Sequence, residues 1–242
     1  MIPKHSVTSD NNLHQAHLQS SDLESRPDKP EEACGVFGIY APAEDVAKLT
    51  YFGLYALQHR GQESAGIATF EETDECTKVH LHKDMGLVSQ VFNEAILEDL
   101  PGYIGIGHTR YSTTGSSRRA NAQPAVVQTR LGPLALAHNG NLVNTVQLRK
   151  ELLQNNCNLL TTTDSEMIAL AIAEEVNAGA DWLDGAVKAF HRCTGAFSLV
   201  IGTPAGVIGT RDPNGIRPLV IGTVGENPLR YVLASETCGL DI

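Results

Sequence analysis

The order of apolar and polar positions predicts short strands interrupted by helices. A buried strand is predicted over residues 34–41, and a helical spacing of apolar residues follows over 44–60, ended by Gly61. Short apolar runs bounded by Gly, Pro or Asn predict further strands over 64–70, 78–85, 102–110, 124–129 and 133–140. Helical spacing returns over 146–156, 164–176 and 183–193. The last predicted strands are 196–203, 206–212, 217–223 and 230–236.

Two groups of strands separated by helices indicate an α+β fold, with antiparallel sheets whose outer faces are covered by helices. Residues 1–33 differ from the rest because they are polar and have no periodic apolar face. Such a segment cannot offset its ordering entropy by burial, so we expect an extended or disordered leader. The folded domain is predicted over residues 34–242.

Composition narrows the class of protein. Hydrophobic residues make up 42% of the 242 positions, enough for a real core, which excludes a disordered or fibrous chain. The formal charge of −10 disfavours binding to nucleic acid or an anionic membrane. We find no apolar run long enough for a membrane span, and the five cysteines are scattered without a C-x-x-C pair. These features predict a cytoplasmic protein, and the cysteine spacing predicts no metal site.

Four features could carry chemistry, and each also has an ordinary structural explanation. Cys34 begins a buried strand, where a cysteine often serves as a small hydrophobe. Arg110 ends a strand, where it could be a surface residue. Asn139-Gly140 could form a hairpin turn, and Asp164 could favour the helix dipole behind a Thr163-x-x-Glu166 capping box. His80 and His82 share one strand face, but with no third ligand spaced to help they are interpreted as surface residues.

Six motifs in register carry a resemblance to a known family. They are CGVFGIYA, LQHRGQESAGIA, GHTRYSTTG, AHNGNLVN, TTDSE and RDPNGIRPL. Together they resemble a class II glutamine amidotransferase domain, an N-terminal-nucleophile (Ntn) hydrolase, over residues 34–242. The resemblance implies a four-layer αββα sandwich of two antiparallel sheets. More narrowly, the chain resembles the glutaminase half of the amidophosphoribosyltransferases, because it reads Gln62-Glu63-Ser64 after His59-Arg60-Gly61 and carries RDPNGIRPL.

The resemblance and the chemistry of amide hydrolysis assign roles to these residues. If the leader is removed, Cys34 offers both a thiol nucleophile and, as its base, an α-amine whose ordinary pKa is about 7.7–8.0. No histidine is then required. The resemblance implies that Asn139 and Gly140 form the oxyanion hole. It further implies that Arg110 binds the glutamine α-carboxylate, that Asp164 binds the α-ammonium group and that Gly61 lines the same pocket.

For a complete enzyme, the resemblance implies that ammonia passes to phosphoribosyl pyrophosphate and gives 5-phosphoribosylamine, the first committed step of purine synthesis. It implies Mg²⁺ with phosphoribosyl pyrophosphate, a [4Fe–4S] cluster in one branch, and a homo-oligomer. The chain has no Asp-Asp pair, so we expect the phosphoribosyltransferase site and these cofactors to lie outside it, leaving at most a weak glutaminase. Two alternatives remain: a hexosamine-6-phosphate synthase-like domain, and a catalytically inactive regulatory domain.

Overall fold

The structure, a computed structural model, describes residues 34–111, 118–224 and 230–242. The predicted leader, residues 1–33, lies outside the described residues. The strands are β1 (Gly35–Tyr40), β2 (Ser64–Glu72), β3 (Thr77–Met85), β4 (Ile104–Arg110), β5 (Ala125–Thr129), β6 (Gly132–Leu142), β7 (Gly195–Thr203), β8 (Gly206–Arg211), β9 (Val220–Val224) and β10 (Arg230–Ala234). The α-helices are α1 (Val46–Ala56), α2 (Val88–Val91), α3 (Glu94–Glu98), α4 (Thr145–Gln154), α5 (Asp164–Asn177) and α6 (Trp182–Phe190). Short 3-10 helices are η2 (Gln58–Arg60), η3 (Arg119–Asn121) and η4 (Thr237–Leu240).

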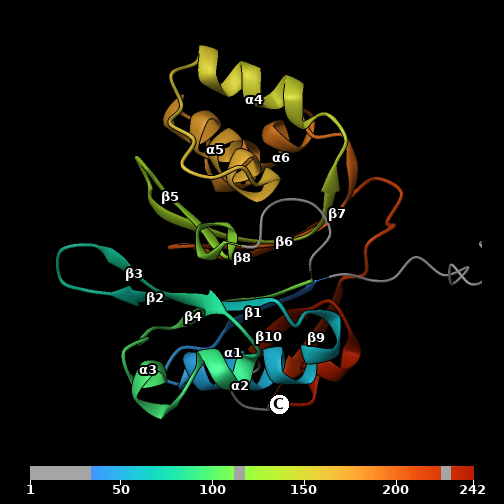
Figure 1. The fold of residues 1–242 in the computed structure, drawn as a ribbon. Coiled ribbons are helices and arrows are strands. Elements are labelled where there is room, and N and C mark those ends of the chain that lie inside the picture. The colour runs from blue at the N-terminus through green and yellow to red at the C-terminus, as the bar shows by residue number, and fades with distance from the viewer. Residues whose placement is uncertain (1–33, 112–117, 225–229) are drawn as a thin grey trace, which may run out of the picture. The chain divides into compact units, whose positions relative to one another are not determined.

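Two antiparallel sheets lie face to face between two helical layers (Figure 1). One has six strands in the order β3-β2-β4-β1-β10-β9, and the other has four in the order β5-β6-β7-β8. Helices α1, α2 and α3 cover the first sheet, and α4, α5 and α6 cover the second (Figure 1). This arrangement confirms the α+β class and the αββα sandwich.

Alternation along the central strand β1 divides its side chains between two cores. Phe37 and Ile39 pack with Leu54 and Leu57 beneath α1. Val36 faces the other way, into the layer between the sheets. The order of strands therefore places the beginning of the folded chain, Cys34, at one end of a strand in the middle of a sheet.

The predicted strands and helices are confirmed, with shifts at their ends. The helix predicted over 44–60 is α1 followed by η2, with Gly61 as the cap of η2. The pattern predicts nothing over 86–101, where the structure has α2 and α3. These helices are four and five residues long, too short to display a helical period.

The hairpin interpretation of Asn139-Gly140 is wrong. Strand β6 continues through both residues to Leu142, with Asn139 opposite Ser198 and Gly140 opposite Phe197. The Asn-Gly pair signals a turn only through local conformational preference, and here pairing with the distant strand β7 decides the outcome.

Candidate active site

A cavity of about 520 Å³ lies at the ends of β4 and β6, beside the first turn of α5. Four of the six residues nominated from the sequence line it: Cys34, Arg110, Gly140 and Asp164. They are far apart in the chain and come together only through the packing of the two sheets. The remaining two, Gly61 and Asn139, are not among the lining residues.

Cys34 lines the cavity immediately before β1 and is buried, with 8% of its surface exposed. Its φ of 75° lies in the left-handed region, which costs a non-glycine residue energy. Burial raises the pKa of the thiol above its ordinary value, against a backbone hydrogen bond from Tyr111 and the positive charges of Arg110 and Arg60. The thiol is therefore protonated at neutral pH, and a base must remove its proton before it can attack.

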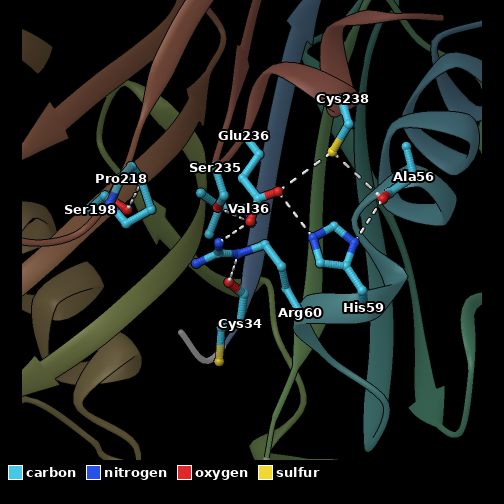
Figure 2. A network of polar contacts seen from close by, with 10 residues as sticks. All are labelled: Cys34, Val36, Ala56, His59, Arg60, Ser198, Pro218, Ser235, Glu236 and Cys238. Atoms are coloured by element: carbon cyan, nitrogen blue, oxygen red, sulfur yellow. Dashed lines mark hydrogen bonds and ion pairs between the residues drawn. The ribbon is translucent and has the colours of Figure 1, made fainter. Parts of the chain in front are cut away.

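A buried arginine supports the main chain of Cys34 (Figure 2). Arg60 Nε donates a 2.8 Å hydrogen bond to the Cys34 carbonyl oxygen, and the Cys34 N–H donates one of 3.0 Å to the Arg60 oxygen. The other side of the guanidinium donates through Nη1 to Oε1 of Glu236, just after β10. This ion pair holds the guanidinium in place, with the Arg60 side chain only 1% exposed.

Arg110, the last residue of β4, is buried, so its interpretation as a surface residue is wrong. Its Nε lies 3.8 Å from Glu63 Oε2, and its carbonyl accepts a 2.9 Å hydrogen bond from the Glu63 N–H. Gly61 packs against the same strand: an added Cβ would lie 2.6 Å from the Thr109 carbonyl carbon and 2.7 Å from the Arg110 nitrogen. Gly61 thus permits the close approach that places the Arg110 main chain.

Strand β6 presents Asn139 and Gly140 on opposite faces. Asn139 shares a face with Ala135 and Ala137, which pack in the layer between the sheets together with Val36. Cys34, two positions before Val36 in the chain, lines the same cavity as Gly140, the residue that follows Asn139. Asn139 is completely buried, and neither atom of its side-chain amide has a hydrogen-bond partner among the described residues.

Gly140 has a positive φ, a backbone conformation that residues with a side chain adopt only with steric strain. Its φ is 145°, and an added Cβ would lie 2.1 Å from the Ala196 oxygen. Without a side chain, its main chain can approach both the neighbouring strand and the cavity.

Asp164 begins α5 and supplies a fixed negative charge to the cavity. Burial works to raise the pKa of its carboxyl, but His138 and the N–H groups of Leu142 and Ser165 outweigh burial and lower the pKa to about 2. Oδ1 lies 3.3 Å from His138 Nδ1, and Oδ2 accepts a 3.1 Å hydrogen bond from the Leu142 N–H. The carboxylate is consequently ionised at all physiological pH values.

The predicted capping box is only half formed. Thr163 accepts a hydrogen bond from the Glu166 N–H at 3.3 Å. The Glu166 carboxylate does not return to Thr163; it accepts instead from the N–H groups of Leu160 and Thr161 at 2.8 and 2.7 Å. Glu166 thereby fixes the loop that leads to Asp164.

Two buried histidines near the cavity escaped the sequence analysis. Burial lowers the pKa of His108 to about 3, so it is neutral, and its Nε2 lies 3.0 Å from the His138 oxygen. His138 lines the cavity and orients Asp164. The only sequence feature that indicates them is their place in two motifs, His108 in GHTR with Arg110 and His138 in AHNG with Asn139.

The motif RDPNGIRPL forms a loop outside the cavity that supports one of the strands of the site. One carboxylate oxygen of Asp212 accepts hydrogen bonds from the N–H groups of Phe197 and Ile216, at 3.2 and 3.0 Å, and the other accepts from Asn214 at 2.9 Å. Since Phe197 is the strand partner of Gly140, this loop braces the strand that presents Gly140.

Comparison with known proteins agrees with this geometry. Residues 108–241 match the family described as "Glutamine amidotransferase domain". The chain belongs to this family. The amidotransferase domain is 71% identical over 216 residues to the amidophosphoribosyltransferase of Synechocystis sp., and 68% identical over 218 residues to that of Synechococcus elongatus. These alignments span 89% and 90% of this chain but only 43% of either relative.

Solved structures give the same result. The amidotransferase domain superposes with a TM-score of 0.75, at 39% identity, on glutamine phosphoribosylpyrophosphate amidotransferase from B. subtilis complexed with ADP and GMP. That match covers 86% of this chain and 43% of the other. A structure described as the allosteric regulatory enzyme of purine biosynthesis matches with a TM-score of 0.76 at 40% identity, over the same shares of the two chains. The chain therefore spans less than half the length of each of these four relatives.

Within the described residues, no helix combines the length and the apolar character needed to cross a membrane.

Proposed function

We propose that residues 34–242 are the glutaminase part of an amidophosphoribosyltransferase. The observation that carries this proposal is that Cys34, Arg110, Gly140 and Asp164 line one cavity. In that reaction a thiol attacks the side-chain amide of glutamine, ammonia leaves, and water hydrolyses the resulting thioester to glutamate.

Cys34 is the nucleophile, and its own nitrogen is the base. In an intact chain this nitrogen is an amide whose lone pair is delocalised, so it cannot accept a proton. Cleavage of the Ala33–Cys34 bond turns it into an amine of suitable basicity. The Arg60 oxygen that now accepts from the Cys34 N–H would then hold that amine beside the thiol.

Attack moves electrons from the amide C=O bond onto its oxygen, and this oxyanion needs donors. Asn139 Nδ2 and the Gly140 N–H are donors on adjacent residues of β6, and the buried Asn139 amide has no hydrogen-bond partner among the described residues. A buried amide without a hydrogen-bond partner destabilises the protein by roughly 1–3 kcal/mol, and a hydrogen bond to the developing oxyanion would offset that penalty in the transition state. As the tetrahedral intermediate collapses, the proton taken from the thiol passes to the departing nitrogen, which leaves as ammonia.

The two charges of glutamine outside its amide can be matched by two of the charged side chains that line the cavity, Arg110 and Asp164. The Arg110 guanidinium can bind the α-carboxylate with two parallel hydrogen bonds. The Asp164 carboxylate, ionised because its pKa is about 2, can bind the α-ammonium group. This pairing orients the side-chain amide toward Cys34.

The acceptor half of the reaction is also proposed by similarity to the relatives. Ammonia would be transferred to phosphoribosyl pyrophosphate, displacing pyrophosphate and giving 5-phosphoribosylamine. An iron–sulfur cluster requires several cysteine ligands, and the described residues bring no such set together. The cluster therefore does not fit the described part of the protein.

Release of glutamate from glutamine tests the proposal. Cys34→Ala should abolish release, whereas Cys157→Ala, which removes a partly buried thiol that does not line the cavity, should leave it unchanged. Glutamate release by Cys34→Ala at the wild-type rate would overturn the proposal.

A further inference from the structure

We propose that His59, Glu236 and Cys238 form a zinc-binding site on the side of Arg60 that faces away from Cys34 (Figure 2). This site is separate from the glutamine cavity and does not depend on the proposed glutaminase function. The cysteine spacing did not indicate this site, because His59 lies near the beginning of the domain sequence and Glu236 and Cys238 lie near its end.

The three ligand atoms are spaced as a zinc ion requires. His59 Nε2 lies 3.0 Å from Glu236 Oε2, and Cys238 Sγ lies 3.7 Å from the same oxygen. All three atoms fall within 4.8 Å of one another. Ligand bonds of about 2.0–2.3 Å at tetrahedral angles place neighbouring ligand atoms roughly 3–4 Å apart, so one ion can bind all three with little movement.

The imidazole of His59 is already oriented for coordination. Its Nδ1 lies 3.1 Å from the Ala56 carbonyl oxygen, which can only accept, so Nδ1 carries the hydrogen. In the neutral ring the lone pair is then on Nε2, which points toward Glu236 and Cys238 (Figure 2). A backbone carbonyl that fixes the tautomer in this way is a common partner of metal-binding histidines.

The Glu236 carboxylate can serve the metal and Arg60 at once. Its Oε1 accepts from Arg60 Nη1, while Oε2 faces His59 and Cys238. A metal on Oε2 leaves the arginine contact intact, and the arginine in turn fixes the direction of the carboxylate.

The donor set selects the metal. A thiolate, an imidazole and a carboxylate match borderline-soft Zn²⁺, whereas Mg²⁺ and Ca²⁺ take oxygen ligands. Binding breaks the Cys238 S–H bond and forms a Zn–S bond, so one proton is released to solvent for each ion bound. The fourth position is taken by water, since His59 is exposed and the site is open to solvent.

A simple ion pair between His59 and Glu236 is the competing explanation. The two side chains are 56% and 34% exposed, so that pair contributes little to stability. An ion pair makes no use of the Cys238 thiol, and this difference makes cysteine the decisive ligand to test.

Cobalt(II) provides the probe, because it replaces zinc and its thiolate complexes absorb in the near ultraviolet. Titration of the 242-residue chain under reducing conditions should give a thiolate-to-cobalt charge-transfer band that saturates at one equivalent, with one proton released per ion. Zn²⁺ should then displace the cobalt and remove the band. A titration without a saturable band would overturn the proposal.

Matched variants locate the site. Cys238→Ser should remove the band, and His59→Gln, at an exposed position that should not impair folding, should weaken binding by more than about tenfold. Cys34→Ser and Cys157→Ser should bind cobalt as the wild type does. Loss of the band in Cys34→Ser with retention in Cys238→Ser would place the metal on the nucleophile and contradict the proposal, as would unchanged affinity in His59→Gln.

Discussion

Arg60 and Cys34 bind each other's main chain: Arg60 Nε donates to the Cys34 oxygen at 2.8 Å, and the Cys34 N–H donates to the Arg60 oxygen at 3.0 Å. This reciprocal pair holds Cys34 at its φ of 75°, a conformation that a non-glycine residue keeps only when its surroundings enforce it. The geometry of the nucleophile therefore depends on a side chain that does not line the cavity.

Arg60→Lys should lower kcat for glutamine hydrolysis, because one ammonium group cannot reach both the Cys34 oxygen and Glu236 in the arginine geometry. The expected loss is about 1–3 kcal/mol, roughly 5- to 150-fold, with KM little changed. Arg130→Lys is the matched control: Arg130 also donates to main-chain oxygens, those of Val176 and Ala180, but away from the cavity. Steady-state kinetics in which both variants lose kcat equally would mean that Arg60 has no specific positioning role.

Arg110→Lys should raise KM for glutamine, because an ammonium group cannot reproduce two parallel hydrogen bonds to the α-carboxylate. The loss should be about 1.5–3 kcal/mol, some 10- to 150-fold. Arg118→Lys, at an exposed position outside the cavity lining, should leave KM unchanged. A wild-type KM in Arg110→Lys would remove the carboxylate role from Arg110.

Asn139→Ala should lower kcat by about 10²–10³, with KM little changed, if Asn139 stabilises the oxyanion. Its free energy of unfolding should hardly fall from lost hydrogen bonds, because the Asn139 amide has no partner among the described residues. Asn144→Ala should show the opposite pattern. The Asn144 amide bonds the Arg192 oxygen at 2.8 Å and the Thr194 N–H at 2.9 Å, so its loss should reduce stability and spare kcat. Denaturant unfolding and kinetics on both variants distinguish the two roles, and a stable, fully active Asn139→Ala would exclude the oxyanion role.

Local patterns predicted most of this fold, because its strands and longer helices each carry their own periodicity. On their own, these patterns left Cys34, Arg110, Gly140 and Asp164 with ordinary structural explanations. The resemblance carried by the six motifs assigned these residues to the site, and the structure brings all four to one cavity. The pairing of Arg60 with Glu236 could not be predicted, since 176 positions separate the two residues. The hairpin interpretation of Asn139-Gly140 was wrong for the same reason: strand β7, which pairs with β6 along these residues, is distant in the sequence.

Asp164 makes stability depend on pH in a defined direction. Its folded pKa of about 2 lies below the ordinary value of 3.8, so the unfolded state takes up the proton first. The contribution, roughly 2 kcal/mol, is therefore present above about pH 4 and is lost as the pH falls through about 2. Urea unfolding should show Asp164→Asn less stable than wild type at neutral pH, with the difference shrinking below about pH 4. Asp181→Asn, which removes an exposed carboxylate at the start of α6, controls for the loss of a negative charge at a helix N-terminus. A difference between wild type and Asp164→Asn that stays constant with pH would contradict the ion pair with His138.

The central claim is that Cys34 acts as an N-terminal nucleophile, and mass spectrometry of the working protein tests it most directly. Active protein, quenched with acid during turnover of glutamine, should have Cys34 as its first residue. It should also carry a γ-glutamyl group, gained with loss of ammonia, on the peptide that begins with Cys34. Full activity in a chain that still begins at Met1, or a glutamyl group on Cys76, Cys157, Cys193 or Cys238 instead, would contradict the account.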